Sequence, residues 1–448
     1  MPPLQILQTP FLQFLEFVEA SDVVQSVFAM SPRPLLRTLS LGLGLTPALS
    51  LAAPSSVNLF ATHYSTQSIH TLTLTTTSNG TYSLTETSSL KTCGTYPSWI
   101  TLDAETDTIY CSDEYGWANV NDTENGSLTS LIVGEDGSLI EEAVTGDAPG
   151  SGVHNVVFQG DAGEKYLAVA HYSGSALSTY TLPLTDNAAP LQVFNYTLAQ
   201  PGANPDRQEA PHPHQTLLDP TGSFILVPDL GADLIRIYSI EKATGQLSAC
   251  PPLNYTRGGG PRHGVFFSGP DESAAIRGRR APFRPSAVGA TLYVAGELNN
   301  EVEAFKVSYP SSGCLSFEQI GAEVPYPEPL PEGSSLAETR IAGESLYVSI
   351  RLDGSFSGDD SLARLSLSSD GSVAFEEISS SGGVLPRTFV INKKGDLVAV
   401  GNQISSTVAI VTRDVETGVL SDVVAEVLVG EPGEPDSLTG LSSVIWDE

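Results

Sequence analysis

Basic residues are few in this 448-residue chain, in which 21 lysines and arginines stand against 52 aspartates and glutamates and the formal net charge is −31. Nucleic acids and anionic membranes are bound through basic surfaces. The composition therefore excludes both as expected partners. An arginine kept in so acidic a chain runs against the trend, which makes clustered arginines candidates for a function.

Several signatures of chemistry are also absent. No Ser-His-Asp nucleophile motif, phosphate-binding glycine-rich loop or dinucleotide fingerprint is visible, and the four cysteines lack the CxxC spacing of a metal site. We therefore expect no cofactor and no metal. The alternative is a calcium site at Glu297, Asn299 and Asn300, but two asparagines beside a glutamate are also ordinary hairpin chemistry.

Long apolar runs are missing, apart from one near the start. Residues 1–29 carry no basic residue, whereas Arg33 and Arg37 precede the apolar run Thr38–Leu51 and a small-x-small site at 50–52. The run is too short to span a membrane, and the pattern predicts a secretory signal peptide over 30–53 and an extracellular protein. Residues 1–29 are then either a gene-model extension before a true start at Met30 or a genuine leader.

Strand-forming residues and turns dominate the rest of the chain, 54–448, as a repeat: a proline-led turn, a strand, a polar turn, a β-rich strand and further strands. The spacing between copies is about 48 to 75 residues, enough for four strands. This predicts an all-β fold, a seven-bladed β-propeller of four-stranded antiparallel blades. A six-bladed propeller is the runner-up. The copies begin at Val57 (a half copy), Pro97, Val153, Pro213, Pro261, Leu336 and Pro386.

The two ends of such a ring have to meet, because closure removes a free sheet edge. We expect the half copy at Val57 to be completed by the last strand, around Val423–Val429. Secretion would allow disulfides: Cys93–Cys111 would join neighbouring strands and Cys250–Cys314 adjacent blades, but all three pairings remain open. The N-x-S/T acceptors are Asn79, Asn121, Asn125, Asn195 and Asn254.

Equivalent positions of a propeller lie at one radius and height, so a polar column forms a ring around the channel. The residue after the leading proline, or its equivalent, gives one column: Ser98, His154, His214, Arg262 and Arg387. The end of the next strand gives another: Asp113, His171, Asp229, Glu297, Arg351 and Asn402. Asp229 and Asn402 have the side chains that support turns. The histidines and arginines suit the binding of an anionic or lactone substrate, and His154, His171 and Arg387 are predicted to contact it.

Four sequence blocks, PHPH…VPDLGAD, GPRH, GELNN and LPRTF, resemble the lactonase family of seven-bladed propellers over about Val57–Val429. The family includes 6-phosphogluconolactonase and 3-carboxy-cis,cis-muconate lactonising activities. The resemblance implies a catalytic set of His214, Arg262, Glu297 and Arg351. Arg351 stands in VSIRLDGS, which lacks the usual asparagine before the arginine.

The chemistry of this set fits lactone opening. A neutral imidazole can act as general base, and guanidinium groups can bind a carboxylate or stabilise an oxyanion. We expect a monomeric, secreted hydrolase that opens sugar lactones without a metal, since phosphorylated sugars are chiefly intracellular. The alternatives are a 6-phosphogluconolactonase or carboxymuconate cyclase activity, and a non-catalytic extracellular binding propeller.

Overall fold

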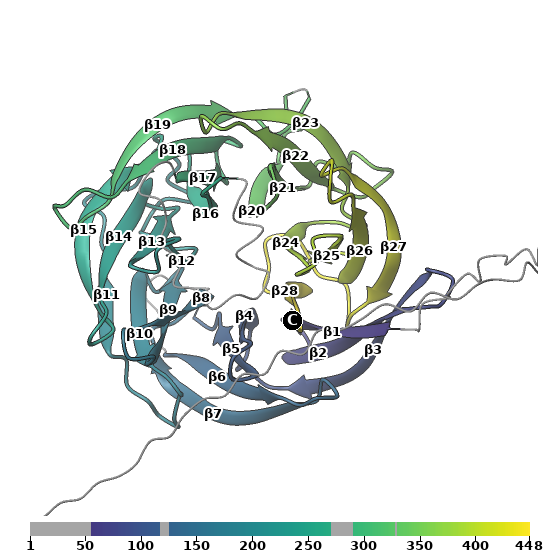
Figure 1. Ribbon diagram of the computed structural model, residues 1–448. Coiled ribbons are helices and arrows are strands. Elements are labelled where there is room, and N and C mark those ends of the chain that lie inside the picture. Colours follow the sequence, from purple (N-terminus) through teal and green to yellow (C-terminus); the bar gives the residue numbers. More distant parts are fainter. Residues whose placement is uncertain (1–54, 117–124, 270–289, 328) are drawn as a thin grey trace, which may run out of the picture. The chain divides into compact units, whose positions relative to one another are not determined.

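The computed structural model describes residues 55–116, 125–269, 290–327 and 329–448. The predicted signal peptide and the acceptor Asn121 lie outside the described residues. The described residues form seven four-stranded antiparallel sheets arranged in a ring (Figure 1), which confirms the predicted propeller. No helix among them is long and apolar enough to cross a membrane.

Each blade runs from an inner strand at the channel to an outer strand at the rim. Blades 1 to 4, from the channel outward, consist of β28 (Leu441–Trp446), β1 (Ser55–His63), β2 (Ser68–Thr76), β3 (Tyr82–Lys91); β4 (Pro97–Asp103), β5 (Thr108–Asp113), β6 (Gly126–Val133), β7 (Leu139–Ala148); β8 (Gly152–Gln159), β9 (Lys165–His171), β10 (Ala176–Thr181), β11 (Gln192–Asn195); and β12 (Leu217–Leu218), β13 (Phe224–Asp229), β14 (Leu234–Glu241), β15 (Gln246–Asn254). Blades 5 to 7 consist of β16 (Pro261–Phe267), β17 (Thr291–Gly296), β18 (Val302–Ser308), β19 (Ser316–Glu323); β20 (Ser335–Ala342), β21 (Ser345–Arg351), β22 (Ser361–Leu367), β23 (Val373–Ser380); and β24 (Pro386–Ile391), β25 (Leu397–Asn402), β26 (Thr407–Arg413), β27 (Leu420–Leu428).

The second strand of each blade gives the repeat its sequence signal. β17, β21 and β25 are buried along their whole length, because neighbouring blades cover both of their faces. A short apolar run between turns is typical of such a strand. The outer strands, such as β3 and β19, are largely exposed and therefore more polar. The core consequently lies between blades, in clusters that each join two neighbours.

The ring closes through β28, which pairs antiparallel with β1 and so joins the end of the chain to its beginning. The prediction that Val423–Val429 forms the closing strand was wrong. That stretch belongs to β27, the outer strand of blade 7, and pairs with β26. Its alternation of exposed and half-buried residues suits an outer strand, whereas β28 is buried at five of its six residues.

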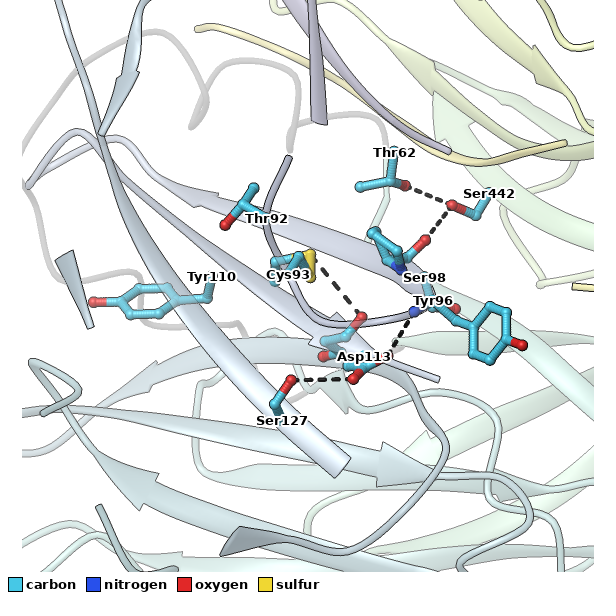
Figure 2. Close-up of a disulfide and its surroundings, with 12 residues drawn as sticks. Thr62, Thr92, Cys93, Tyr96, Ser98, Tyr110, Asp113, Ser127 and Ser442 are labelled. Carbon is cyan, nitrogen blue, oxygen red and sulfur yellow. Dashed lines mark hydrogen bonds between the residues drawn. A yellow bond between two sulfur atoms is a disulfide. The ribbon is translucent and has the colours of Figure 1, made fainter. Parts of the chain in front are cut away.

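Two disulfides select one of the three possible pairings. Cys93–Cys111 ties the segment after β3 to β5 of the next blade, and Cys250–Cys314 joins blades 4 and 5. Beside the first disulfide, Asp113 accepts hydrogen bonds from the Tyr96 amide and the Ser127 hydroxyl (Figure 2). The four described acceptor asparagines are all exposed: Asn79, Asn125, Asn195 and Asn254.

Candidate active site

A one-residue irregularity near the start of the inner strands turns side chains toward the channel mouth. In blade 5, Pro261 pairs with Gly296 and His263 with Ala295, so Arg262 has no partner on β17. Such a β-bulge re-aims the extra side chain. The corresponding extra residues of four other blades are Ser98, Val153, Arg387 and Ser442. His214 lies at the same place in blade 4, between the Pro213–Asp229 bridge and the Leu217–Leu226 pair.

This register moves His154 out of the column in which the sequence pattern placed it. The extra residue of β8 is Val153, and His154 pairs with Ala170 as His263 pairs with Ala295. His154 therefore lies one layer deeper in the channel, stacked on Trp99 at 4.1 Å between ring centroids. The bulge cannot be read from the spacing of prolines, since β8 begins with a glycine.

A cavity of about 830 Å³ lies where the inner strands begin and the second strands end. Its wall contains five of the seven predicted site residues, namely His214, Arg262, Glu297, Arg351 and Arg387. The wall does not include His154 or His171. His171 is fully buried at the end of β9, where its Nε2 lies 2.7 Å from the Ser178 hydroxyl, and burial lowers its pKa to about 3. These contacts give His171 a place in the packing of its own blade.

Glu297 joins three guanidinium groups. Its Oε1 lies 2.6 Å from Nη2 of Arg207, and its Oε2 lies 2.8 Å from Nε of Arg262 and 3.1 Å from Nη2 of Arg351. Burial favours the neutral acid, but Arg351, Arg207 and Arg262 outweigh it and lower the pKa of Glu297. Glu297 is therefore an anion at neutral pH, surrounded by a surplus of positive charge.

Several donors of these arginines remain unused. Nη1 of Arg262 and Nε of Arg351 have no hydrogen-bond partner within the described part of the chain, and Nε of Arg262 touches Glu297 without hydrogen-bond alignment. A buried donor without an acceptor is costly unless a ligand or water fills it. Burial, with Arg351 beside it, lowers the pKa of Arg262 to about 9, which leaves the group cationic at neutral pH. The positive charge of the two guanidinium groups beside the cavity suits an oxyanion or carboxylate.

Arg387 lies in the cavity wall beside a second carboxylate. Its Nη2 is 3.4 Å from Oε2 of Glu114, the oxygen that also accepts hydrogen bonds from the hydroxyls of Tyr64 and Ser98. Although burial opposes it, Tyr64 and Glu114 raise the pKa of Arg387.

His214 begins a chain of buried polar groups. Its Nδ1 lies 3.2 Å from Nε2 of His263, whose Nδ1 lies 3.1 Å from both carboxylate oxygens of Glu338. Nη1 of Arg340 lies 2.6 Å from Oε1 of Glu338. Burial, with Arg262 next in effect, lowers the pKa of His214 well below its usual value, so its imidazole is neutral at neutral pH. A neutral imidazole in a cavity wall is suited to accept a proton.

Residues that sequence reasoning missed complete the site. Arg207 and Tyr172 come from segments between the strands of the repeat, where no column predicts them. His263 directly follows Arg262 in the GPRH block, and Glu338 lies in β20, two residues after the start of the sixth copy at Leu336. Among the described residues no group of three His, Cys, Asp or Glu side chains could hold a metal ion.

The channel mouth of this propeller thus combines a neutral histidine, a carboxylate and several guanidinium groups. Residues 58–435 match the family described as "Lactonase, 7-bladed beta-propeller". The chain therefore belongs to the lactonase family of seven-bladed β-propellers and is an enzyme of the lactone hydrolase class.

Relatives and solved structures agree with this assignment. The chain is 31% identical to the probable 6-phosphogluconolactonase of Arthroderma benhamiae, over 76% of this chain and 79% of that protein. It is 27% identical to the 6-phosphogluconolactonase of Bacillus subtilis, over 61% and 69%. The fold is that of the periplasmic gluconolactonase of Pseudomonas aeruginosa, with a TM-score of 0.67 at 23% identity over 88% of this chain and 99% of that one.

Proposed function

We propose that this protein is a secreted lactonase that opens sugar lactones, of the aldonolactone class, by metal-independent general acid–base catalysis at the channel mouth. The observation that carries the proposal is the meeting of His214 with the guanidinium groups of Arg262 and Arg351 in one cavity wall. The base and the oxyanion donors are thus available to the same bound lactone.

In the proposed reaction His214 acts first as a base and then as an acid, while the arginines hold the oxyanion. Water attacks the lactone carbonyl carbon while His214 accepts its proton, and the carbonyl oxygen becomes an oxyanion held by Arg262 and Arg351. The tetrahedral intermediate then collapses, the ring C–O bond breaks, and His214 returns the proton to the departing alkoxide. The product is the open hydroxy acid, whose carboxyl proton goes to solvent. Glu297 keeps the arginines in place, and Arg387 contacts the substrate.

The chemistry around Glu297 supports catalysis without a metal. A calcium site there would need this carboxylate as a ligand, but three guanidinium groups already occupy it. A cation would have to enter against the positive charge that surrounds Glu297.

Two observations support an extracellular sugar lactone over a phosphorylated one. Two disulfides involve all four cysteines, as expected in an oxidising compartment, where phosphorylated sugars are scarce. In addition, the whole cavity wall contains five carboxylates against four guanidinium groups, and the exposed carboxylates Asp206, Glu209 and Asp436 would repel a phosphate dianion. An uncharged aldonolactone escapes this repulsion and gains its charge only in the transition state.

The test is the rate of lactone opening by the purified protein, followed by pH-stat titration with gluconolactone, cellobionolactone and 6-phosphogluconolactone. We expect acceleration above the buffer rate, preference for the uncharged lactones and no effect of a chelator. His214→Ala should abolish the acceleration, whereas His70→Ala, at a histidine that pairs with Glu86 outside the cavity, should retain it. A folded protein that leaves every lactone at the buffer rate would overturn the proposal.

A further inference from the structure

We infer that His263 and Glu338 are positioning residues, which fix the tautomer of His214 so that its Nε2 is the proton acceptor. The inference rests on the proposed role of His214 as the base. The three side chains come from consecutive blades and are almost completely buried, with exposed fractions of 6% for His214, 1% for His263 and 0% for Glu338.

The protonation pattern of the chain starts from Glu338. Burial opposes its ionisation, but Arg340 and His263 lower the pKa of Glu338 to about 2, so it is a carboxylate. An ionised carboxylate can only accept hydrogen bonds. His263 lies 3.1 Å from it through Nδ1, so this nitrogen must carry the hydrogen. Burial lowers the pKa of His263 to about 4, despite Glu338, and its ring is therefore neutral with an unprotonated Nε2.

The same logic then sets the state of His214. The unprotonated Nε2 of His263 can only accept, and Nδ1 of His214 is 3.2 Å away, so Nδ1 of His214 carries the hydrogen. A neutral imidazole has one protonated nitrogen. Nε2 of His214 is then left with its lone pair, which is the form a general base needs. The opposite tautomer would set two lone pairs or two N–H groups against each other within this chain.

The chain also compensates charge during the reaction. When Nε2 of His214 accepts the proton of the attacking water, the ring becomes an imidazolium next to Arg262, which disfavours that charge. The Glu338 carboxylate opposes this effect through His263 without receiving the proton itself. A buried carboxylate that orients a histidine stabilises its protonated form in this way.

The packing around His263 keeps the chain aligned. Its ring lies edge-on to those of Trp99, His154 and His214, at centroid distances of 5.5, 5.3 and 5.1 Å. His154 therefore packs against His263, the residue that contacts His214. If Glu338 served only as an ion-pair partner for Arg340, replacing this carboxylate would not change the tautomer of His214.

The decisive variant is Glu338→Gln. The Thr339 amide and Arg340 both donate to Oε1, so the amide oxygen of the glutamine should take that place and its NH₂ should face His263. His263 must then accept through Nδ1 and donate through Nε2, and His214 is driven into the wrong tautomer. We expect kcat for the lactone to fall by roughly 10²–10⁴-fold, the range lost with a general base, while KM changes little.

Nitrogen-15 NMR of the histidine side chains provides a readout independent of turnover. The wild-type protein should show His214, assigned by its loss in His214→Ala, as the Nδ1–H tautomer, and Glu338→Gln should convert it to Nε2–H. Glu303→Gln is the matched control, because Glu303 is equally buried (1% exposed) but lies outside the cavity wall, and it should change neither signal nor rate. His263→Phe keeps a ring in place and should lower kcat similarly.

An unchanged Nδ1–H tautomer in Glu338→Gln, or unchanged kcat in both folded variants, would overturn the inference. If the wild-type protein opens no lactone, the proposed function fails, but the tautomer measurement still decides whether Glu338 controls the state of His214. The two failures are therefore distinguishable.

Discussion

Oε2 of Glu297 lies 2.8 Å from Nε of Arg262, with both side chains almost completely buried. The two come from one blade: Arg262 is the extra residue of the β16 bulge, and Glu297 directly follows β17. Arg262 and Glu297 alone would form a pair with no net charge. Arg207 and Arg351 reach the same carboxylate from other segments, so the cluster keeps a positive surplus toward the cavity.

Replacing the carboxylate should therefore destabilise the protein. Glu297→Gln leaves Arg262 and Arg351 buried without their counter-ion, a change that costs about 3–5 kcal/mol in the free energy of unfolding. Urea denaturation measures it. Glu377→Gln removes the partner of Arg364 in a more exposed pair and should cost less than about 1 kcal/mol. Equal stabilities of the two variants would show that Glu297 is not the counter-ion that holds the cluster.

The variant Arg262→Lys tests the geometry of the guanidinium group, because it keeps the positive charge. An ammonium group is a point charge and cannot contact Glu297 and offer a separate donor to the cavity as a guanidinium does. We expect kcat for lactone opening to fall by roughly 10²–10³-fold, as for loss of an oxyanion donor, with KM nearly unchanged. Steady-state kinetics would show this. Arg364→Lys, in β22 and outside the cavity wall, should retain the wild-type rate, and a fully active Arg262→Lys would contradict the assigned role.

Much of the fold was predictable, because every blade needs the same pattern of buried strands and polar turns. The second strand is buried on both faces and so reads as an apolar run, as in Leu346–Ile350 of β21, and the turns on either side mark its ends. The closing strand was not predictable in this way. β28 stands apart from any complete copy of the repeat, and its pairing with β1 and its burial distinguish it from β27.

Site residues were predictable where their place in the repeat brings them to the cavity. They were not predictable where their role depends on contacts between blades. His214, Arg262 and Arg387 follow the prolines that begin the repeats, and the structure places all three in the cavity wall. His154 was placed one residue off because a bulge is invisible in the spacing. Glu338 was missed because its meaning depends on His263 of the neighbouring blade.

The closing strand can be tested by truncation. A chain that ends at Gly440 lacks β28 and leaves the inner edge of β1 unpaired, with the buried residues Leu59 and Ala61 exposed on one side. We expect a loss of more than about 4 kcal/mol of stability, the range of severe core damage, and aggregation through the free edge. Calorimetry and light scattering measure both.

A synthetic peptide of residues 441–446 supplies the control for this truncation. Added in excess, it should raise the melting temperature of the truncated chain, whereas a scrambled peptide of the same composition should not. A truncated chain that melts like the full-length protein would contradict closure through β28.

The pH dependence of the reaction should reflect the low pKa of His214. Burial, followed by Arg262, His263 and Arg387, lowers this pKa well below 6.5. The neutral ring is the active form, so kcat/KM should stay level as the pH falls through 6.5 and decline only nearer the folded-state pKa. Arg387→Gln removes one of the positive charges and should raise the pKa of His214, which moves the decline to higher pH.

The measurement is the pH profile of kcat/KM above the buffer rate, for wild type, Arg387→Gln and the control Arg364→Gln in β22. The control should leave the profile unmoved, since Arg364 pairs with Glu377 and lies outside the cavity wall. A wild-type decline centred at 6.5 would mean that His214 titrates as an ordinary exposed imidazole. That result would contradict the buried, cation-flanked base on which the proposed mechanism depends, because such a base must remain unprotonated where a free histidine is already half charged.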